Sequence, residues 1–391
     1  MRYVDEFRDQ GLAQDLAATL SRTLTRPRRI MEVCGTHTMA VFRNGLTTLL
    51  PEGLELVSGP GCPVCVTSAP HIDAFLALAG RSGIIIATFG DLFRVPGSAG
   101  TSLAHARSQG ARIEVIYSPM EGLRLARDHP DETVILLGIG FETTTPGVAA
   151  TIRVAKREGL NNFLCFSTQK LIPPPLMSLF ADPEQNIDAL LCPGHVSAII
   201  GTAAYAPLAK QYHLPCVISG FEPVDILQAL LLLVRQLEEG RAQVENAYTR
   251  VVSHAGNIPA QTLVAEVFAP ADTAWRGLGI IPDSGLALRD HYRVHDAQER
   301  LGVVVAPATE VQGCRCGQIL QGRIRPPACP KFKALCTPAN PVGPCMVSSE
   351  GTCAAYYNYA PESPAKRRTP ILRQDTQQVM PASAGGSERS S

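Results

Sequence analysis

The sequence predicts an α/β protein built from two open parallel-sheet domains and a smaller, irregular Cys-rich iron-sulfur domain. Eight short runs are nearly continuous in apolar residues, which is typical of parallel strands buried on both faces. Segments with helical spacing separate these runs, as in open α/β sheets. Beyond residue 313 the chain becomes dense in Cys, Pro and Gly, so long regular elements are not expected there.

The strands and helices are predicted in chain order. The eight runs are RRIMEVCG (28–35), LELVSG (54–59), GIIIATFGD (83–91), ARIEVIYS (111–118), TVILLGIGFE (133–142), NNFLCFST (161–168), ALLCPGH (189–195) and PCVISGFE (215–222). The helical segments between them include SAPHIDAFLALAG (68–80), SLAHARSQG (102–110), MEGLRLARDHP (120–130) and VAATIRVAKREG (148–159).

Five regions are expected along the chain. A helix within residues 1–27 packs on the C-terminal domain, and two similar α/β domains follow at 28–122 and 123–219. The segment 222–248 has the pattern of one long helix opened by Pro223 and Asp225, and no parallel-strand pattern returns after it. Residues 220–361 therefore form a helical and Cys-rich iron-sulfur domain, and the polar residues 362–391 a disordered tail.

Composition narrows the classes of function. The chain has 391 residues, 45% of them hydrophobic, which is enough for two or three domains with buried cores. Lys plus Arg and Asp plus Glu both number 35, so no overall field attracts nucleic acid or an anionic membrane. No apolar run reaches the roughly 20 residues of a membrane span, and the charged start lacks the apolar core of a signal peptide. We therefore expect a cytoplasmic protein with no nucleic-acid or membrane partner.

Twelve cysteines in a reducing compartment favour metal binding or redox chemistry over structural disulfides. Cys165, Cys192 and Cys216 lie in or beside apolar runs, where free cysteine commonly behaves as a small buried hydrophobe. The other nine form three clusters: Cys34 alone, the pair at 62 and 65, and six between 314 and 353.

Four loop motifs follow predicted strands, where ligands of open α/β sheets bind. They are CGTHT (34–38), GPGCPVC (59–65), GFETTTPG (140–147) and CPGHVS (192–197). We expect them to lie on one sheet edge and to form one composite site.

Each loop offers reactive side chains with more than one interpretation. Cys62 and Cys65 have the spacing of a shared metal site or of a reversible disulfide, and the pair alone does not decide between them. Cys34 with His37 suits a shared metal, a Cys/His general-base couple or an ordinary turn. Glu142 and His195, at further strand ends, are candidates for a general base or for orienting a ligand, or merely cap a helix.

The C-terminal cysteines are the strongest indication of metal. Only the first two are tightly spaced, whereas zinc sites usually have two tight pairs, so the spacing favours an iron-sulfur cluster. Six thiols for four positions leave two over. The six are Cys314, Cys316, Cys329, Cys336, Cys345 and Cys353.

Five motifs in this order resemble the HypD family of NiFe-hydrogenase maturation proteins. They are EVCGTHTMAV (32–41), GPGCPVCVT (59–67), GFETTTPG (140–147), CPGHVSAIIG (192–201) and CTPANPVGPCMVSSEGTCAAYYNY (336–359). The resemblance implies a complex with a small HypC-type chaperone, on which iron receives cyanide and CO to form Fe(CN)2CO. It also implies that HypE, supplied by HypF, donates the cyanide, and that the product passes to the hydrogenase large subunit.

The resemblance also implies site residues. The family's iron-binding cysteines match Cys34, Cys62 and Cys65. Its 4Fe-4S cluster maps onto the C-terminal cysteines, where the resemblance is tightest around Cys314, Cys329, Cys336 and Cys353 and leaves Cys316 and Cys345 as extras.

Soft thiolates suit low-spin iron carrying cyanide and CO. His37, Glu142 and His195 would then hydrogen-bond cyanide nitrogen or move protons during ligand transfer. Alternatively, Cys62 and Cys65 cycle through a disulfide whose electrons come from the 4Fe-4S cluster. Three hypotheses therefore stand: a maturation scaffold rather than a conventional turnover enzyme, an iron-sulfur-dependent thiol-disulfide oxidoreductase, and a zinc-stabilised binding protein.

Overall fold

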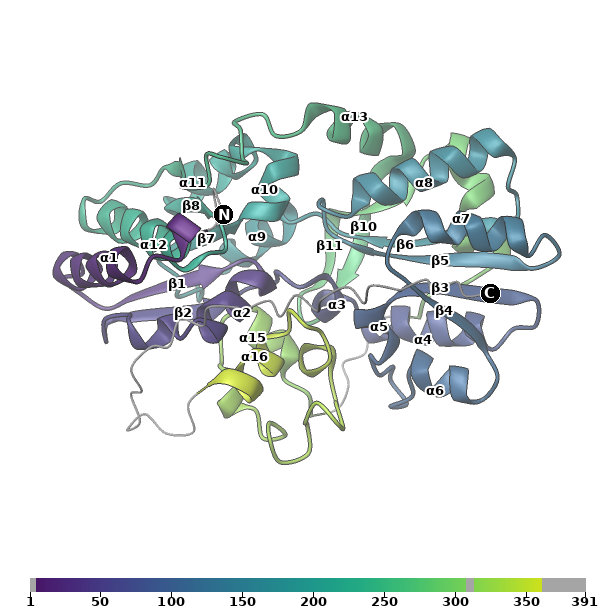
Figure 1. The fold of residues 1–391 in the computed structure, drawn as a ribbon, viewed down its shortest axis with the longest axis horizontal. Coiled ribbons are helices and arrows are strands. Elements are labelled where there is room, and N and C mark those ends of the chain that lie inside the picture. The colour runs from purple at the N-terminus through teal and green to yellow at the C-terminus, as the bar shows by residue number, and fades with distance from the viewer. Residues whose placement is uncertain (1–4, 307–312, 361–391) are drawn as a thin grey trace, which may run out of the picture.

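The computed structural model describes residues 5–306 and 313–360, in which two parallel sheets lie side by side (Figure 1). The first sheet has five strands in the order β2-β1-β7-β8-β9, and every pair in it is parallel. Its strands are β1 (Arg28–Glu32), β2 (Leu54–Ser58), β7 (Ala189–Pro193), β8 (Cys216–Ser219) and β9 (Val244–Asn246).

The second sheet has four parallel strands in the order β4-β3-β5-β6. They are β3 (Ile84–Phe89), β4 (Arg112–Ile116), β5 (Thr133–Gly140) and β6 (Phe163–Gln169). All eight predicted apolar runs are therefore strands. The central strand β5 is buried at every position after its first, which explains why its sequence shows no polar alternation.

Helices cover both sheets, as the α/β prediction requires. They are α1 (Gln10–Thr23), α2 (Gly35–Arg43), α3 (Pro63–Val66), α4 (Ala69–Ala79), α5 (Gly90–Phe93), α6 (Leu103–Ser108), α7 (Pro119–Asp128), α8 (Thr145–Glu158), α9 (Pro173–Phe180), α10 (Gly194–Ile200), α11 (Ala206–Tyr212), α12 (Pro223–Glu238), α13 (Ile258–Val267), α14 (Ala297–Leu301), α15 (Cys316–Leu320) and α16 (Thr352–Tyr359). The four predicted helical segments correspond to α4, α6, α7 and α8. No helix in the described part of the chain is long and apolar enough to cross a membrane.

The two sheets do not coincide with the predicted halves 28–122 and 123–219. The chain forms β1 and β2, then all four strands of the second sheet, and returns to the first sheet with β7. The expected boundary at 122 falls inside α7, which covers the second sheet. Apolar runs indicate where strands are but not which strands pair, because pairing is decided by contacts between distant segments.

Helix α12 begins where Pro223 and Asp225 predicted, with a capping box formed by Glu222 and Asp225. It ends at Glu238 rather than continuing to 248, since Gly240 adopts a left-handed φ of 64° and β9 then pairs with β8. Helix α1 packs on α12, and α12 packs on β7 and β8. The N-terminal helix therefore contacts a helix of the 220–361 segment that covers the first sheet.

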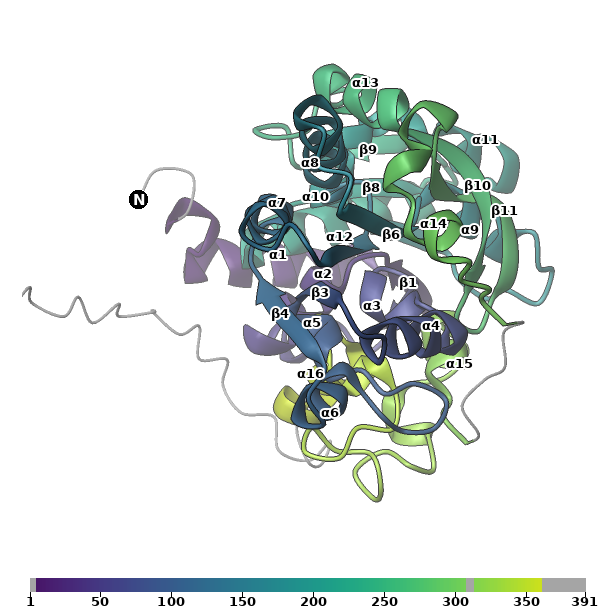
Figure 2. The same cartoon turned by 90° about the vertical axis from the view of Figure 1, so that its right-hand side faces the viewer.

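An antiparallel hairpin was not predicted. Strands β10 (Phe268–Trp275) and β11 (Gly279–Leu288) pair with each other, and β11 contacts β6 and α9 (Figure 1). In Figure 1 the Cys-rich segment beyond residue 313 lies below the first sheet and the junction between the two sheets, where α16 packs on α2 and α15 on α3 (Figures 1 and 2). The expected disordered tail at 362–391 lies outside the described residues.

Candidate functional site

The two thiol loops of the first sheet touch each other. Cys34 follows β1 and caps α2, and Gly61 follows β2. The N–H of Gly35 donates to the carbonyl of Gly61 at 3.0 Å. A Cβ at residue 61 would lie 2.3 Å from the backbone nitrogen of Cys34, so only glycine allows this approach. The sequence thus brings both predicted thiol loops to one place.

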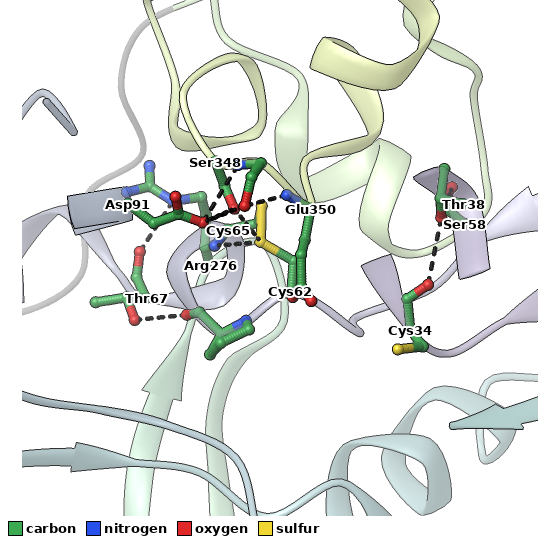
Figure 3. Close-up of a disulfide and its surroundings, with 12 residues drawn as sticks. Cys34, Thr38, Ser58, Cys62, Cys65, Thr67, Asp91, Arg276, Ser348 and Glu350 are labelled. Carbon is green, nitrogen blue, oxygen red and sulfur yellow. Dashed lines mark hydrogen bonds between the residues drawn. A yellow bond between two sulfur atoms is a disulfide. The ribbon is translucent and has the colours of Figure 1, made fainter. Parts of the chain in front are cut away.

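Cys62 and Cys65 form a disulfide (Figure 3). Cys62 caps the short helix α3, and its sulfur accepts a hydrogen bond from the N–H of Cys65 at 3.1 Å. Only 3% of Cys62 and none of Cys65 is exposed. Of the two interpretations left open by the spacing, the structure contains the oxidised pair.

Cys34 is a buried free thiol beside a carboxylate. Burial, followed by the charge of Glu350, raises the pKa of Cys34 to about 12. Glu350 is held there because its Oε1 accepts a hydrogen bond from Thr36 at 2.6 Å and its backbone packs against Gly35. A thiol held neutral in this way is a poor nucleophile for hydrolysis, and binding a metal there must displace its proton.

His37 and His195 meet across an aromatic ring. Both rings stack on the ring of Phe221, and the centroid of Phe221 lies 4.6 Å from that of His37 and 4.0 Å from that of His195. His37 is fully buried, its Nε2 donates to the carbonyl of Gly220 at 2.9 Å, and burial lowers its pKa to about 4. The ring is therefore neutral, and its buried Nδ1 has no hydrogen-bond partner among the described residues.

His195 is exposed at the start of α10, and partial burial of its ring lowers its pKa. Phe221, which brings the two histidines together, was missed by the sequence reasoning. Its position directly after the apolar run of β8 was the available signal.

Glu142 does not share this sheet edge. It follows β5 of the second sheet, so the prediction that all four loops lie on one edge is wrong: three belong to the first sheet. Its Oε1 accepts the N–H of Ile172 at 2.9 Å, and its buried Oε2 has no partner among the described residues. Burial raises the pKa of Glu142 to about 7.

Residues of the Cys-rich segment cover the disulfide, which the sequence reasoning also missed. The hydroxyl of Ser348 lies 3.5 Å from the sulfur of Cys62 and donates to Oδ2 of Asp91 at 3.1 Å (Figure 3). Asp91 ends the apolar run 83–91, a strand-end acid of the same kind as Glu142. Three parts of the chain, after β2, after β3 and before α16, therefore meet at this bond.

Five of the six C-terminal cysteines line one small cavity. Its other walls are mostly apolar, and the N–H of Val342 donates to the sulfur of Cys336 at 3.3 Å. Cys345 does not line it but is fully buried beside the sulfurs of Cys316 and Cys353. The lining cysteines are Cys314, Cys316, Cys329, Cys336 and Cys353.

This donor set fits a 4Fe-4S cluster, because convergent thiols in an apolar pocket with a backbone N–H on one sulfur are what such clusters use. The cavity encloses about 10 Å³, and the sulfurs of Cys314 and Cys316 are 3.2 Å apart, so the thiols must separate to hold a cluster. Within the described residues no three His, Cys, Asp or Glu side chains are spaced to hold a metal ion as they stand. Cys165, Cys192 and Cys216 are fully buried, as predicted.

Comparison with known proteins gives a consistent result. The HypD model, described as the hydrogenase formation hypA family, matches residues 10–360. The hydrogenase maturation factor HypD of Azotobacter vinelandii is 47% identical over 367 residues, covering 92% of this chain and 97% of that protein. Those of Rhodobacter capsulatus and Escherichia coli K12 are each 45% identical, covering 92% of this chain and 98% of each relative.

Proposed function

Because the chain belongs to the HypD family of hydrogenase maturation factors, we propose that it is the scaffold on which the Fe(CN)2CO unit of a NiFe hydrogenase is assembled. One observation carries this proposal. The loop of Cys34 and the loop of the 62–65 pair are in direct backbone contact, and the Cys-rich segment covers them. A scaffold for building a metal centre needs metal ligands next to a source of electrons. The cysteines of the two loops can act as the ligands, and the cysteines of the Cys-rich segment can hold the electron source.

Iron, as the cargo, is bound by Cys34, Cys62 and Cys65. Because a disulfide sulfur is not a thiolate, the 62–65 bond must be reduced before these two cysteines can ligate. Cys34 must lose a proton whose pKa burial raises to about 12, which the positive charge of the metal makes possible.

The neighbouring side chains orient the ligands. The neutral, buried His37 donates through Nε2, so its unpartnered Nδ1 is an acceptor, and it can hold a water molecule that in turn donates to a cyanide nitrogen. His195, on the exposed side of Phe221, is placed to exchange protons with solvent. Glu142, on the other sheet, is too deeply enclosed for that exchange, and we assign it to holding the β5 loop through Ile172.

The resident cofactor is a 4Fe-4S cluster held by Cys314, Cys329, Cys336 and Cys353. When bound, it supplies one-electron reduction chemistry to the neighbouring thiols. Cys316 and Cys345 are then the two extra thiols. The partners are a HypC-type chaperone, HypE as the cyanide donor and, through the chaperone, the hydrogenase large subunit.

Infrared spectroscopy of the protein copurified with its chaperone tests the proposal. Cys34→Ala should lose the bands of iron-bound cyanide and CO while the visible absorbance of the 4Fe-4S cluster remains. Cys165→Ala, which removes a buried thiol from β6, should keep both and serves as the matched control. Full-intensity cyanide and CO bands on Cys34→Ala would overturn the assignment of this ligand.

A thiol-disulfide oxidoreductase is the second candidate, favoured by the disulfide itself. In that case the purified protein should exchange electrons with dithiol substrates, and the double variant Cys62→Ser, Cys65→Ser should lose that activity. Cyanide and CO bands on the wild-type complex decide for the scaffold, since an oxidoreductase has no use for them.

A further inference from the structure

Ser348 is in contact with the disulfide and with a carboxylate at the same time. Its Oγ lies 3.5 Å from Sγ of Cys62 and 3.1 Å from Oδ2 of Asp91, and it accepts the N–H of Glu350 at 3.1 Å (Figure 3). Ser348 is 1% exposed, so these contacts are made away from bulk water. Hydrogen bonds to charge are stronger in such surroundings than at the surface.

The single hydrogen of this hydroxyl has two possible acceptors. While the disulfide is intact, Cys62 carries no charge, and the carboxylate of Asp91 is both the stronger acceptor and the nearer one. When the bond opens, the released Cys62 sulfur becomes a thiolate. Rotation about the Ser348 Cβ–Oγ bond then turns the same hydrogen towards that charge.

Asp91 keeps partners when the hydroxyl turns away. Its Oδ2 also accepts the N–H of Ser349 at 3.2 Å and the Oγ of Ser349 at 2.8 Å. These two bonds fix the 348–350 segment whichever way the hydroxyl of Ser348 points. Asp91 is thus a positioning residue, which holds Ser348 within reach of the sulfur.

Within residues 5–306 and 313–360, the hydrogen-bond donors at this disulfide contact the sulfur of Cys62 and not that of Cys65. Besides the Ser348 hydroxyl, the N–H of Cys65 donates to the Cys62 sulfur at 3.1 Å. Two donors on one sulfur make it the better leaving group and the more stable thiolate of the pair. The other acid on this segment, Glu350, is turned to Thr36, and the Nε of Arg276 donates to the carbonyl of Thr67.

We propose that Ser348, positioned by Asp91, is the hydrogen-bond donor that stabilises the Cys62 thiolate when the 62–65 disulfide opens. This rests on the redox use of that bond proposed above. With a dithiol reductant, one thiolate of the reagent attacks Cys65 Sγ, the S–S bond breaks, and its electron pair goes to Cys62 Sγ. The second thiol of the reagent then attacks the mixed disulfide, so that the reagent leaves as a cyclic disulfide and Cys65 as a thiol.

The test measures the opening of this bond by dithiothreitol in the anaerobic holoprotein. Reaction is stopped with a maleimide, and the peptide containing residues 62–65 is quantified by mass spectrometry at several ratios of reduced to oxidised reagent. Ser348→Ala should slow the opening and lower the equilibrium constant for reduction, each about tenfold, as expected for a lost hydrogen bond to a charge. A tenfold change in that constant is about 30 mV in the reduction potential.

Three variants distinguish the loss of the hydrogen bond to the Cys62 thiolate from a general loosening of the 348–350 segment. Ser349→Ala removes a hydroxyl bonded to the same carboxylate but not to the sulfur, while the Ser349 N–H still holds the segment, and should shift the potential much less than Ser348→Ala does. Ser348→Thr keeps the hydroxyl and should restore the wild-type potential. Asp91→Asn weakens the hold on the segment but also removes a negative charge near Cys62, and because these two effects oppose each other it should lower the equilibrium constant less than Ser348→Ala does.

Equal potentials for Ser348→Ala and the wild type, or equal shifts in Ser348→Ala and Ser349→Ala, would overturn the inference. Cluster absorbance and melting temperature confirm that each variant is folded and loaded. The proposed function fails separately: if the variant Cys62→Ser, Cys65→Ser still supports full hydrogenase maturation, the redox use of the bond is refuted while the measured effect of Ser348 on the potential stands.

Discussion

The buried carboxyl of Glu142 should make the stability of this protein fall as pH rises. Burial raises its pKa from 4.5 to about 7 in the folded protein, whereas the unfolded chain keeps the ordinary value. Between these two values the folded state binds more protons than the unfolded state, so the free energy of unfolding decreases with pH. A difference of two to three pKa units corresponds to a loss of about 3 kcal/mol that is complete above pH 7.

Glu142→Gln should remove this dependence. The amide oxygen can still accept the N–H of Ile172, and the amide group carries no charge at any pH. The new NH2 group has the same lack of a partner that Oε2 has now, and this cost is equal at all pH values. Relative to the wild type, the variant should therefore gain about 3 kcal/mol of stability between pH 4.5 and pH 8.

Urea denaturation at the two pH values, followed by tryptophan fluorescence, measures this gain. Trp275 is the single tryptophan of the chain, and its ring stacks on that of Phe141, the neighbour of Glu142, with centroids 6.1 Å apart. Glu184→Gln, at an exposed position, is the control for a surface carboxylate. If the midpoints of Glu142→Gln and the wild type differ by the same amount at both pH values, the carboxyl does not titrate as the burial argues.

Three further predictions follow from packing and ligation. Gly61→Ala should separate the two thiol loops and lower stability by about 3 kcal/mol, because the new Cβ would meet backbone atoms. Gly147→Ala is the control: the nearest atom to its Cβ is 3.9 Å away, so it should not lower stability. Thermal melts of the two variants measure the difference. Cys353→Ala should abolish the visible absorbance of the cluster, and Cys345→Ala should retain it; the reverse result would exchange their roles. Asp225→Asn should cost about 2 kcal/mol in urea unfolding, because the fully buried carboxylate of Asp225 accepts two charged hydrogen bonds from the partly exposed Arg250; a change below 1 kcal/mol would refute this.

Elements with a strong local signal were predictable. Continuous apolar runs gave all eight long parallel strands, and a proline with an acidic residue at the helix start gave α12. Pairing was not predictable, because the return of the chain from the second sheet to β7 depends on contacts across more than a hundred residues. The hairpin of β10 and β11 lacks a regular alternation of apolar residues, and Pro270 lies within it, so its pattern argued against a strand.

The residues of the candidate site likewise fall into those that the sequence could predict and those that it could not. Residues of reactive type at strand ends were found from sequence, namely Cys34, His37, His195 and the 62–65 pair. No sequence pattern singles out Ser348, which lies in a segment noted only for its cysteines. Its contact with the sulfur of Cys62 arises from the fold. The prediction of one common sheet edge failed for the Glu142 loop, because every parallel strand ends in a similar loop whichever sheet it joins.

The contacts of one short segment tie the chemistry of the disulfide to that of Cys34. Glu350 accepts Thr36 through its carboxylate, packs its backbone on Gly35, and donates its N–H to the Ser348 oxygen. Opening the 62–65 bond places a charge beside Ser348. A shift of Ser348 would reach Glu350 through the hydrogen bond from the Glu350 N–H, and the carboxylate of Glu350 helps to keep Cys34 protonated. Under the proposed function, iron binds only after the disulfide has been reduced, and this coupling would give the two events their order. The coupling predicts that alkylation of Cys34 is faster in the protein with a reduced 62–65 pair than in the oxidised protein. Glu350→Gln should diminish this difference in rate. Equal alkylation rates in the two redox states would show that the two sites are independent.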